Sequence, residues 1–213
     1  IFTDKSNLDI TNFDLLKEFF KKNTIDTVIN CAAYTDVEKA ESKQNLANTI
    51  NHKAVSFLAN ICYRHNIQLI HISTDYVFEG NQDKIYTEND ITNPLSYYGK
   101  TKLDGEHSIL KHKLNNSIII RTSWLYSEFE NNFVSKILDR FIRCSEVQVV
   151  SDEVGSPTNS LDLAKTILDI IPKIKNNQTE IYHFSNIGYC SRIEFANEIK
   201  NIMKSNVKLI PYI

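Results

Sequence analysis

The chain alternates between short apolar segments and longer amphipathic segments, and this alternation limits the folds that it can adopt. Apolar strands are expected near residues 26–30, 67–73 and 117–122. Amphipathic helices with apolar residues at three- and four-residue spacing are expected over about residues 13–22, 45–64 and 95–113. Strands that alternate with helices form a parallel sheet. The pattern therefore predicts an α/β fold of the doubly wound, Rossmann-like type, with helices on both faces of the sheet.

The rhythm loosens after Trp124. Further helices are expected near residues 131–143, 160–171 and 191–203, and further strands near 147–150 and 180–184. We predict a boundary near residue 125, between a larger region (1–124) and a smaller lobe (125–213). No finishing element is expected at the end of the sequence given. Thr11 is the expected cap of the helix that begins near residue 13, because a Thr hydroxyl can accept from a first-turn backbone N–H.

Composition narrows the class of protein. Apolar residues make up 42% and charged residues 23% of 213, and the net charge is −2, so no electrostatic argument favours nucleic acid or an anionic membrane as a partner. No apolar run approaches the roughly 18 residues of a membrane span. The four cysteines lack C-x-x-C spacing, which argues against a zinc site or a disulfide framework. We expect reduced thiols and a cytoplasmic location, and we assign no metal-binding residues, although the sequence does not decide whether a divalent metal binds.

A Tyr and a Lys four residues apart, Tyr98 and Lys102, form the most informative short motif. Residues at this spacing lie one turn apart on one face of a helix. A buried ammonium there is expected to lower the pKa of the phenol and to make it a useful general acid or base. The apolar strand that ends at Ser73 and Thr74 would add a hydroxyl. A Tyr and a Lys four residues apart occur by chance in many proteins. An apolar strand that ends in Ser-Thr and precedes them by about two dozen residues is a much more specific signal of a Thr–Tyr–Lys catalytic group.

Three informative segments follow predicted strands: residues 30–33, 73–74 and 122–124. Ligands of open parallel sheets bind beyond the carboxyl ends of the strands. The small side chains of Ala32 and Ala33 would let the backbone approach a flat ligand closely, although tight packing explains an Ala-Ala pair equally well. No G-x-G-x-x-G occurs in the sequence. A dinucleotide-binding protein would need its phosphate loop before Ile1, and we expect that arrangement.

Several segments resemble the dTDP-4-dehydrorhamnose reductase family, which belongs to the extended short-chain dehydrogenase/reductases. The segments that carry the resemblance are residues 30–41 (NCAAYTDVEKAE), 73–78 (STDYVF), 98–106 (YGKTKLDGE), 121–126 (RTSWLY) and 155–158 (GSPT). They follow the family's order and spacing over nearly the whole chain. The resemblance implies that an N-terminal part with the first βαβ elements and a C-terminal part lie outside this sequence. Residues 1–124 would then be the cofactor-binding and catalytic region, and 125–213 mainly the substrate-binding lobe.

The resemblance also implies roles for individual residues. Thr74 would hydrogen-bond the ketone oxygen of the substrate, and Tyr98 would deliver a proton to it. Lys102 would bind the nicotinamide ribose of NADPH or NADH and lower the pKa of Tyr98. The residues implied near the cofactor are Asp9 and Ile10, at its adenine end, and Cys31, Ala32 and Ala33, along its length.

Thr35, Val37, Tyr76 and Trp124 match positions that contact the sugar nucleotide in the family. Each has a plainer interpretation. Trp124 is the only tryptophan and can be a core residue at a strand end, and Tyr76 alternates with its neighbours as in a half-buried segment. A flat aromatic ring such as that of Trp124 also suits packing on a sugar or base.

The residue at position 76 separates two reactions within the superfamily. Sugar-nucleotide dehydratases carry Thr-Asp-Glu where this chain has Thr74, Asp75 and Tyr76. A phenol cannot replace a carboxylate base near neutral pH, whereas ketone reduction needs only one proton donor and one hydride. The resemblance therefore implies an NAD(P)H-dependent reductase that converts dTDP-4-dehydro-L-rhamnose to dTDP-L-rhamnose.

Two alternatives stay open: a non-catalytic regulatory or binding subunit of the same fold, and another sugar-nucleotide epimerase or reductase. The expected partner is a dTDP-sugar, with no nucleic acid and no membrane. The sequence does not decide between NADPH and NADH, because the deciding residue follows a strand that it does not contain. It also does not decide between a monomer and a homodimer.

Overall fold

The structure is a computed structural model that describes residues 1–81, 84–129 and 132–213. The chain divides into two compact units. The first consists of residues 1–81, 86–121 and 173–183, and the second mainly of residues 122–172 and 184–213. This division differs from a single boundary near residue 125, because a late strand returns to the sheet of the first unit. Within the described ranges, no helix is long and apolar enough to cross a membrane.

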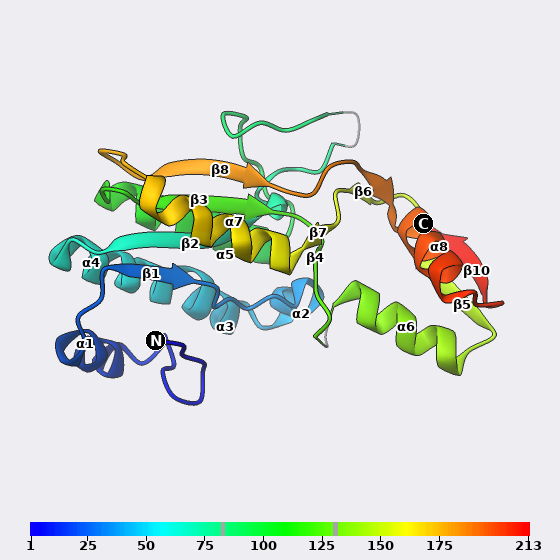
Figure 1. The fold of residues 1–213 in the computed structure, drawn as a ribbon, viewed down its shortest axis with the longest axis horizontal. Coiled ribbons are helices and arrows are strands. Elements are labelled where there is room, and N and C mark those ends of the chain that lie inside the picture. The colour runs from blue at the N-terminus through cyan, green and yellow to red at the C-terminus, as the bar shows by residue number, and fades with distance from the viewer. Residues whose placement is uncertain (82–83, 130–131) are drawn as a thin grey trace. The chain divides into compact units, whose positions relative to one another are not determined.

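Four strands form the sheet of the first unit, in the order β1-β2-β3-β8. They are β1 (Thr27–Asn30), β2 (Gln68–Thr74), β3 (Ile118–Thr122) and β8 (Glu180–Phe184). β1 and β2 pair in parallel, with Asn30 opposite His71, and all four arrowheads point the same way in Figure 1. β3 is rich in β-branched residues and fully buried, as expected for a strand that is covered on both faces. The predicted parallel α/β sheet is confirmed.

The helices of the first unit follow the predicted segments, with one addition. They are α1 (Phe13–Lys22), α2 (Val37–Ser42), α3 (Gln44–Asn48), the π-helical η1 (Thr49–Ala54), α4 (Val55–His65), the 3-10 turn η2 (Asp75–Val77) and α5 (Tyr97–His112). α3, η1 and α4 together make the single helix predicted over 45–64. The additional helix is α2, which was not predicted; the Asp36 side chain caps its N-terminus and accepts from Lys39 N.

The predicted helix cap at Thr11 is wrong. The Asn12 side chain accepts from Leu15 N and caps α1. Thr11 instead donates its backbone N–H and its hydroxyl to Asp9 Oδ1, at 2.9 and 2.7 Å. Because the Thr11 hydroxyl is hydrogen-bonded to Asp9, it does not cap α1, and the side chain of the next residue is the N-cap.

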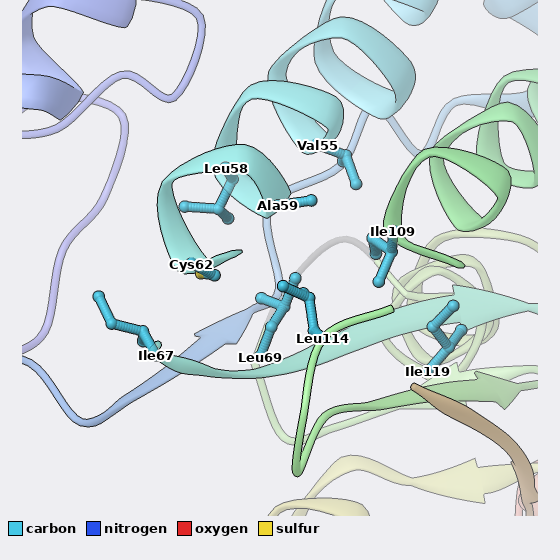
Figure 2. Packing of buried hydrophobic residues seen from close by; sticks show 9 residues of the cluster. All are labelled: Val55, Leu58, Ala59, Cys62, Ile67, Leu69, Ile109, Leu114 and Ile119. Carbon is cyan, nitrogen blue, oxygen red and sulfur yellow. The ribbon is translucent and has the colours of Figure 1, made fainter. Parts of the chain in front are cut away.

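The main core of the first unit lies between α4, α5 and the sheet. Figure 2 shows Val55, Leu58, Ala59 and Cys62 of α4 on the side that faces β2, close to Ile109 of α5. Leu69 of β2 and Ile119 of β3 complete the same buried cluster. Full burial of a Leu or Ile side chain contributes roughly 1.5–3 kcal/mol. This cluster therefore fixes α5 on the sheet, and α5 carries the Tyr98–Lys102 motif.

The second unit contains three short sheets and three helices among its described residues. Its strands are β4 (Leu125–Tyr126), β5 (Glu146–Val150), β6 (Val154–Gly155), β7 (Thr158–Asn159), β9 (Cys190–Ser191) and β10 (Lys208–Tyr212). Its helices are α6 (Phe133–Arg143), α7 (Ser160–Ile170) and α8 (Arg192–Met203), followed after α7 by the 3-10 turn η3 (Ile171–Lys173) at the boundary of the units. The helix predicted over 131–143 is thus present from residue 133, while residue 131 lies outside the described residues.

The pairing of the second unit corrects one expectation. β5 pairs in parallel with β10, β4 in parallel with β7, and β6 antiparallel with β9. β10 is the finishing element that the sequence analysis did not find, because its segment contains Pro211 and reads as a chain end. Val147 and Val149 of β5 form a buried cluster with Ile137 of α6 and Ile199 of α8.

Candidate active site

The three predicted catalytic residues all lie in the first unit and are all buried. Thr74 is the last residue of β2, and Tyr98 and Lys102 lie in the first two turns of α5. Ser96 begins the helix, because its side chain accepts from Gly99 N at 3.1 Å. A strand end and a helix start thus supply the predicted group. Among the described residues, no three His, Cys, Asp or Glu side chains are placed to hold a metal ion.

Two glycines let α5 approach its neighbours at backbone distance. A Cβ on Gly99 would lie 2.1 Å from the carbonyl oxygen of Tyr76, and a Cβ on Gly105 would lie 2.3 Å from that of Asn51. Neither gap can hold a carbon atom, so only glycine fits at both positions. The backbone of α5 is therefore held directly against η2 and η1, and Tyr98 and Lys102 inherit that placement.

Tyr98 stays a phenol near neutral pH in this structure. Burial raises the pKa of Tyr98 to about 12, because the phenolate loses its hydration, while a hydrogen bond with the Thr74 side chain opposes the shift and the nearby Asp75 adds to it. The predicted lowering of the Tyr98 pKa by Lys102 is therefore wrong here. The physical reason is that burial of the phenol outweighs the opposing hydrogen bond, while Lys102 Nζ donates to the backbone oxygen of Ile72.

Lys102 Nζ lies 2.6 Å from the backbone oxygen of Ile72 and 3.4 Å from Nε2 of His71. Its side chain is among the most deeply buried large ones in the molecule. Burial lowers the pKa of Lys102 to about 8, against the opposing charges of Glu106 and Cys31. Lys102 is thus a group that changes its charge close to physiological pH.

Two buried polar residues that were not predicted as site residues, His71 and Asn30, form a line of contacts with Lys102. His71 is fully buried, and its Nδ1 lies 3.0 Å from Nδ2 of Asn30. Asn30 Oδ1 accepts in turn from the backbone N–H of Ala32 at 3.2 Å. Burial, followed by the charge of Lys102, holds the pKa of His71 well below its usual range, so the imidazole is neutral.

A second buried polar group lies one turn beyond Lys102. Glu106 accepts from Ser73 Oγ at 2.5 Å and from Arg121 Nη2 at 2.7 Å, and the Arg121 guanidinium also lies 5.1 Å from the ring centre of Phe78. Because both partners of Glu106 come from β2 and β3, this ion pair ties α5 to the sheet.

The residues predicted to line a cofactor differ in their exposure and in their local contacts. Cys31 and Ala32 are exposed and Ala33 is half-buried just beyond the carboxyl end of β1, where a ligand could reach them. Asp9, in contrast, accepts both hydrogen bonds from Thr11 described above, which lower its pKa. Ile10 packs on the apolar cluster under α1. Local structure therefore accounts for both residues without a ligand.

The residues predicted to contact the substrate fall into two groups. Val37 and Tyr76 pack around Tyr98, and the Tyr76 ring meets the Tyr98 ring edge-on with centroids 5.6 Å apart. Thr35 is exposed immediately before α2. Trp124 belongs to the second unit.

Trp124 has partners of its own in the second unit. The guanidinium carbon of Arg192 lies 3.5 Å from the Trp124 ring centre, and a Cβ on Gly155 would lie 2.5 Å from the same ring. Arg192 is held by Glu153, whose Oε2 accepts from Arg192 Nε at 3.0 Å. Trp124 has a φ of 44°, an uncommon value for a residue with a side chain. Arg192 therefore covers part of the ring surface that a sugar or base could use.

A family model described as the RmlD substrate binding domain matches residues 1–212. The chain belongs to this family. The dTDP-4-dehydrorhamnose reductase of Aggregatibacter actinomycetemcomitans is 40% identical over 196 residues, which are 91% of this chain and 66% of that protein. The resemblance to the dTDP-4-dehydrorhamnose reductase family that the sequence motifs indicate is thereby confirmed.

Solved structures of proteins named dTDP-4-dehydrorhamnose reductase match this fold closely. The dTDP-4-dehydrorhamnose reductase of Bacillus anthracis in complex with NADP has a TM-score of 0.93 and 36% identity, over 99% of this chain and 73% of that one. The enzyme of the same name from Clostridium acetobutylicum has a TM-score of 0.92 and 40% identity, over 100% of this chain and 74% of that one. The chain spans about two thirds of the length of the curated relatives it matches.

The residues that the sequence analysis missed in this RmlD-family chain share a weak sequence signal. Asn30, His71 and Glu106 are polar residues at positions that the strand and helix patterns assign to the core. A buried polar residue needs a partner, and the sequence does not say which residue that partner is. Gly99 and Gly105 give a clearer signal, since two of the chain's five glycines lie inside one helix.

Proposed function

We propose that the whole protein reduces the 4-keto group of a dTDP-6-deoxyhexose with NADPH or NADH and converts dTDP-4-dehydro-L-rhamnose to dTDP-L-rhamnose. The observation that carries the proposal is the buried Thr74–Tyr98–Lys102 group, in a chain 40% identical to a dTDP-4-dehydrorhamnose reductase. The reduction adds a hydride to the ketone carbon and a proton to its oxygen. A bound nicotinamide supplies the hydride.

Tyr98 is the proposed proton donor. With a pKa of about 12, its hydroxyl carries a proton throughout the physiological range. Phenol acidity rises when the resulting phenolate has hydrogen bonds and nearby positive charge, and Thr74 supports the first of these conditions. Thr74 Oγ1 donates to Asp75 Oδ1 at 3.1 Å, and rotation of this hydroxyl could redirect its hydrogen to a ketone oxygen.

The residues at the end of β1 and on α5 fit the nicotinamide half of such a cofactor. Ala32 and Ala33 present small side chains beyond the strand end, and Lys102 and Tyr98 offer polar hydrogens that ribose hydroxyls can accept. These residues would hold the ribose and its ring, while Lys102 in its ammonium form would stabilise charge that develops on Tyr98.

The contact between Tyr76 and Tyr98 supports a reductase over a dehydratase. Elimination of water needs a further acid/base pair to move the ring proton and the leaving hydroxyl. The position that would provide the carboxylate is a tyrosine packed edge-on against Tyr98, and a phenol with an ordinary pKa near 10 is a poor base at neutral pH.

The test is a product assay with the whole protein. NADPH and NADH oxidation would be followed with a panel of dTDP- and UDP-4-keto-6-deoxy sugars, and the products would be identified by mass spectrometry. We expect nucleotide oxidation that depends on a dTDP-4-keto sugar, with a product two hydrogens heavier. A folded protein that binds the dTDP-sugar and oxidises neither nucleotide would contradict the proposal and favour a regulatory subunit.

A further inference from the structure

A line of buried polar contacts runs from the backbone to Lys102. Asn30 is 4% exposed, His71 0% and Lys102 2%. The parallel register of β1 and β2 places Asn30 directly opposite His71, and Lys102 reaches His71 from α5. Three secondary-structure elements thus contribute one residue each, and all three side chains are screened from water.

The backbone N–H of Ala32 determines which atom donates and which accepts in each of the following hydrogen bonds. The backbone N–H of Ala32 can only donate, so the atom of Asn30 that it contacts must be the oxygen. Asn30 then turns its amide nitrogen, which is a donor, toward Nδ1 of His71. Nδ1 must accept, and a neutral imidazole that accepts at Nδ1 carries its hydrogen on Nε2.

The hydrogen on Nε2 of His71 faces Lys102 Nζ at 3.4 Å. An ammonium has no lone pair and cannot accept this hydrogen, whereas a neutral amine can. The backbone oxygen of Ile72, 2.6 Å from Nζ, accepts from either form. Lys102 therefore lies between one fixed donor and one fixed acceptor, and this pairing is complete only for the amine.

The other charged and titratable groups around Lys102 do not cancel this preference. Glu106 on α5 has its carboxylate oxygens engaged by Arg121 of β3 and by Ser73 of β2. Cys31, beyond β1, is a further titratable group that acts on Lys102. Glu106, the carboxylate that acts on Lys102, is therefore already paired with Arg121, whose Nη2 lies 2.7 Å from Glu106 Oε2.

We propose that Asn30 and His71 are positioning residues that set the protonation state of Lys102. The Ala32 N–H orients the Asn30 amide, the amide selects the tautomer of His71, and the imidazole N–H holds the neutral amine of Lys102. The meaning of this arrangement for turnover rests on the reductase function proposed above, in which it would determine the pH at which Lys102 loses its charge one helical turn from Tyr98.

The test is an NMR titration of Lys102 in the whole protein without added nucleotide. In protein labelled with 13C at lysine Cε, the chemical shift of each Cε reports whether its amine is charged. The signal of Lys102 is assigned as the one that is missing from the spectrum of Lys102→Met. His71→Phe keeps a buried ring and deletes both nitrogens. Asn30→Ala leaves every direct contact of Lys102 in place and frees the tautomer of His71.

Both variants should move the midpoint of the Lys102 titration upward by about one pH unit, the size expected of one hydrogen bond between neutral groups. His52→Phe is the matched control, because His52 Nδ1 also lies 3.0 Å from an asparagine side chain, that of Asn48, in the same unit. It should leave the Lys102 midpoint unchanged. An unchanged midpoint in folded His71→Phe, or an equal shift in His52→Phe, would overturn the proposal.

Asn30→Ala separates the two halves of the proposal. A shift in His71→Phe without one in folded Asn30→Ala would overturn the tautomer relay. If either variant does not fold, 15N NMR of the wild-type imidazoles still decides, because the proposal requires His71 to carry its hydrogen on Nε2 between pH 6 and pH 9. An Nδ1–H tautomer or an imidazolium in that range would overturn it. These measurements need no substrate, so failure of the proposed reduction would leave their outcome unaffected.

Discussion

Each of the two units contains an arginine paired with a carboxylate, and the two pairs differ in how far they are buried. Arg121 of the first unit has a side chain 4% exposed, and its partner Glu106 is 0% exposed. Arg192 of the second unit is 16% exposed, and its partner Glu153 is 50% exposed. The first pair ties α5 to the sheet, while Arg192 stacks on the Trp124 ring. Arg121 therefore serves the placement of residues on α5, and Arg192 covers an aromatic ring near the surface.

Among variants of these residues, Arg121→Met should lower the stability of the folded chain most. Removing one partner of a buried ion pair leaves Glu106 charged and unpaired, which should lower the free energy of unfolding by about 3–5 kcal/mol. Urea unfolding at pH 7 measures the loss. The double variant Arg121→Met with Glu106→Gln should recover a large part of it, because no unpaired charge is then buried. A double variant as unstable as the sum of the single ones would contradict this account of the pair.

Lys102 should make stability depend on pH. Its pKa is about 8 in the folded chain against an ordinary value near 10.4, so between these values the unfolded state binds the extra proton. Stability then rises with pH across this window. Wild type should gain about 3 kcal/mol relative to Lys102→Met between pH 8 and pH 10.5. Parallel pH profiles of unfolding in the two proteins would show that Lys102 titrates normally.

A smaller effect is expected where the backbone of α5 meets η2. In Gly99→Ala the new methyl group collides with the Tyr76 carbonyl oxygen, so the helix must shift, at a cost of about 1–3 kcal/mol. A shift of about 1 Å in the catalytic group should also slow turnover roughly 100-fold. Lys100→Ala is the control, because Lys100 is exposed on the same helix. Equal behaviour of the two variants in unfolding and turnover assays would mean that the close approach does not position Tyr98.

The smallest effect belongs to the second unit. Arg192→Ala removes a stacked guanidinium and a half-exposed ion pair, which together contribute about 0.5–2 kcal/mol. Arg192→Lys keeps the charge but not the planar group and should recover less than half of that loss. Thermal unfolding compares the two variants. A loss as large as that of Arg121→Met would remove the contrast between the units.

The sequence predicted most of the elements and the chemical group that they carry. The buried run at 118–120 and the four-residue spacing of Tyr98 and Lys102 are local patterns, and local patterns identify strands and helix faces well. The position of Thr74 at the end of β2 was predicted correctly, because the apolar run before it is a local pattern too.

What the sequence did not predict depends on pairing between distant segments. Asn30 meets His71 only because β1 and β2 pair in one particular register. β10 was missed because its segment contains Pro211, and its partner β5, about sixty residues earlier, gives no local signal of the pairing. The Tyr98 pKa was predicted in the wrong direction because the degree to which tertiary packing buries the phenol cannot be read from the spacing of Tyr98 and Lys102, and burial raises this pKa. The spacing also does not show that the Lys102 amine donates to the backbone oxygen of Ile72.

The central claim is that Tyr98 donates the proton in a keto-sugar reduction, and Tyr98→Phe tests it most directly. Phe keeps the buried ring and its contact with Tyr76 and deletes only the hydroxyl. The measurement is the rate of NADPH or NADH oxidation with dTDP-4-dehydro-L-rhamnose at pH 7, using whole protein whose fold is checked by circular dichroism. We predict a loss of roughly 100- to 10,000-fold with nucleotide binding retained. A folded variant that reduces the sugar at the wild-type rate would contradict the claim.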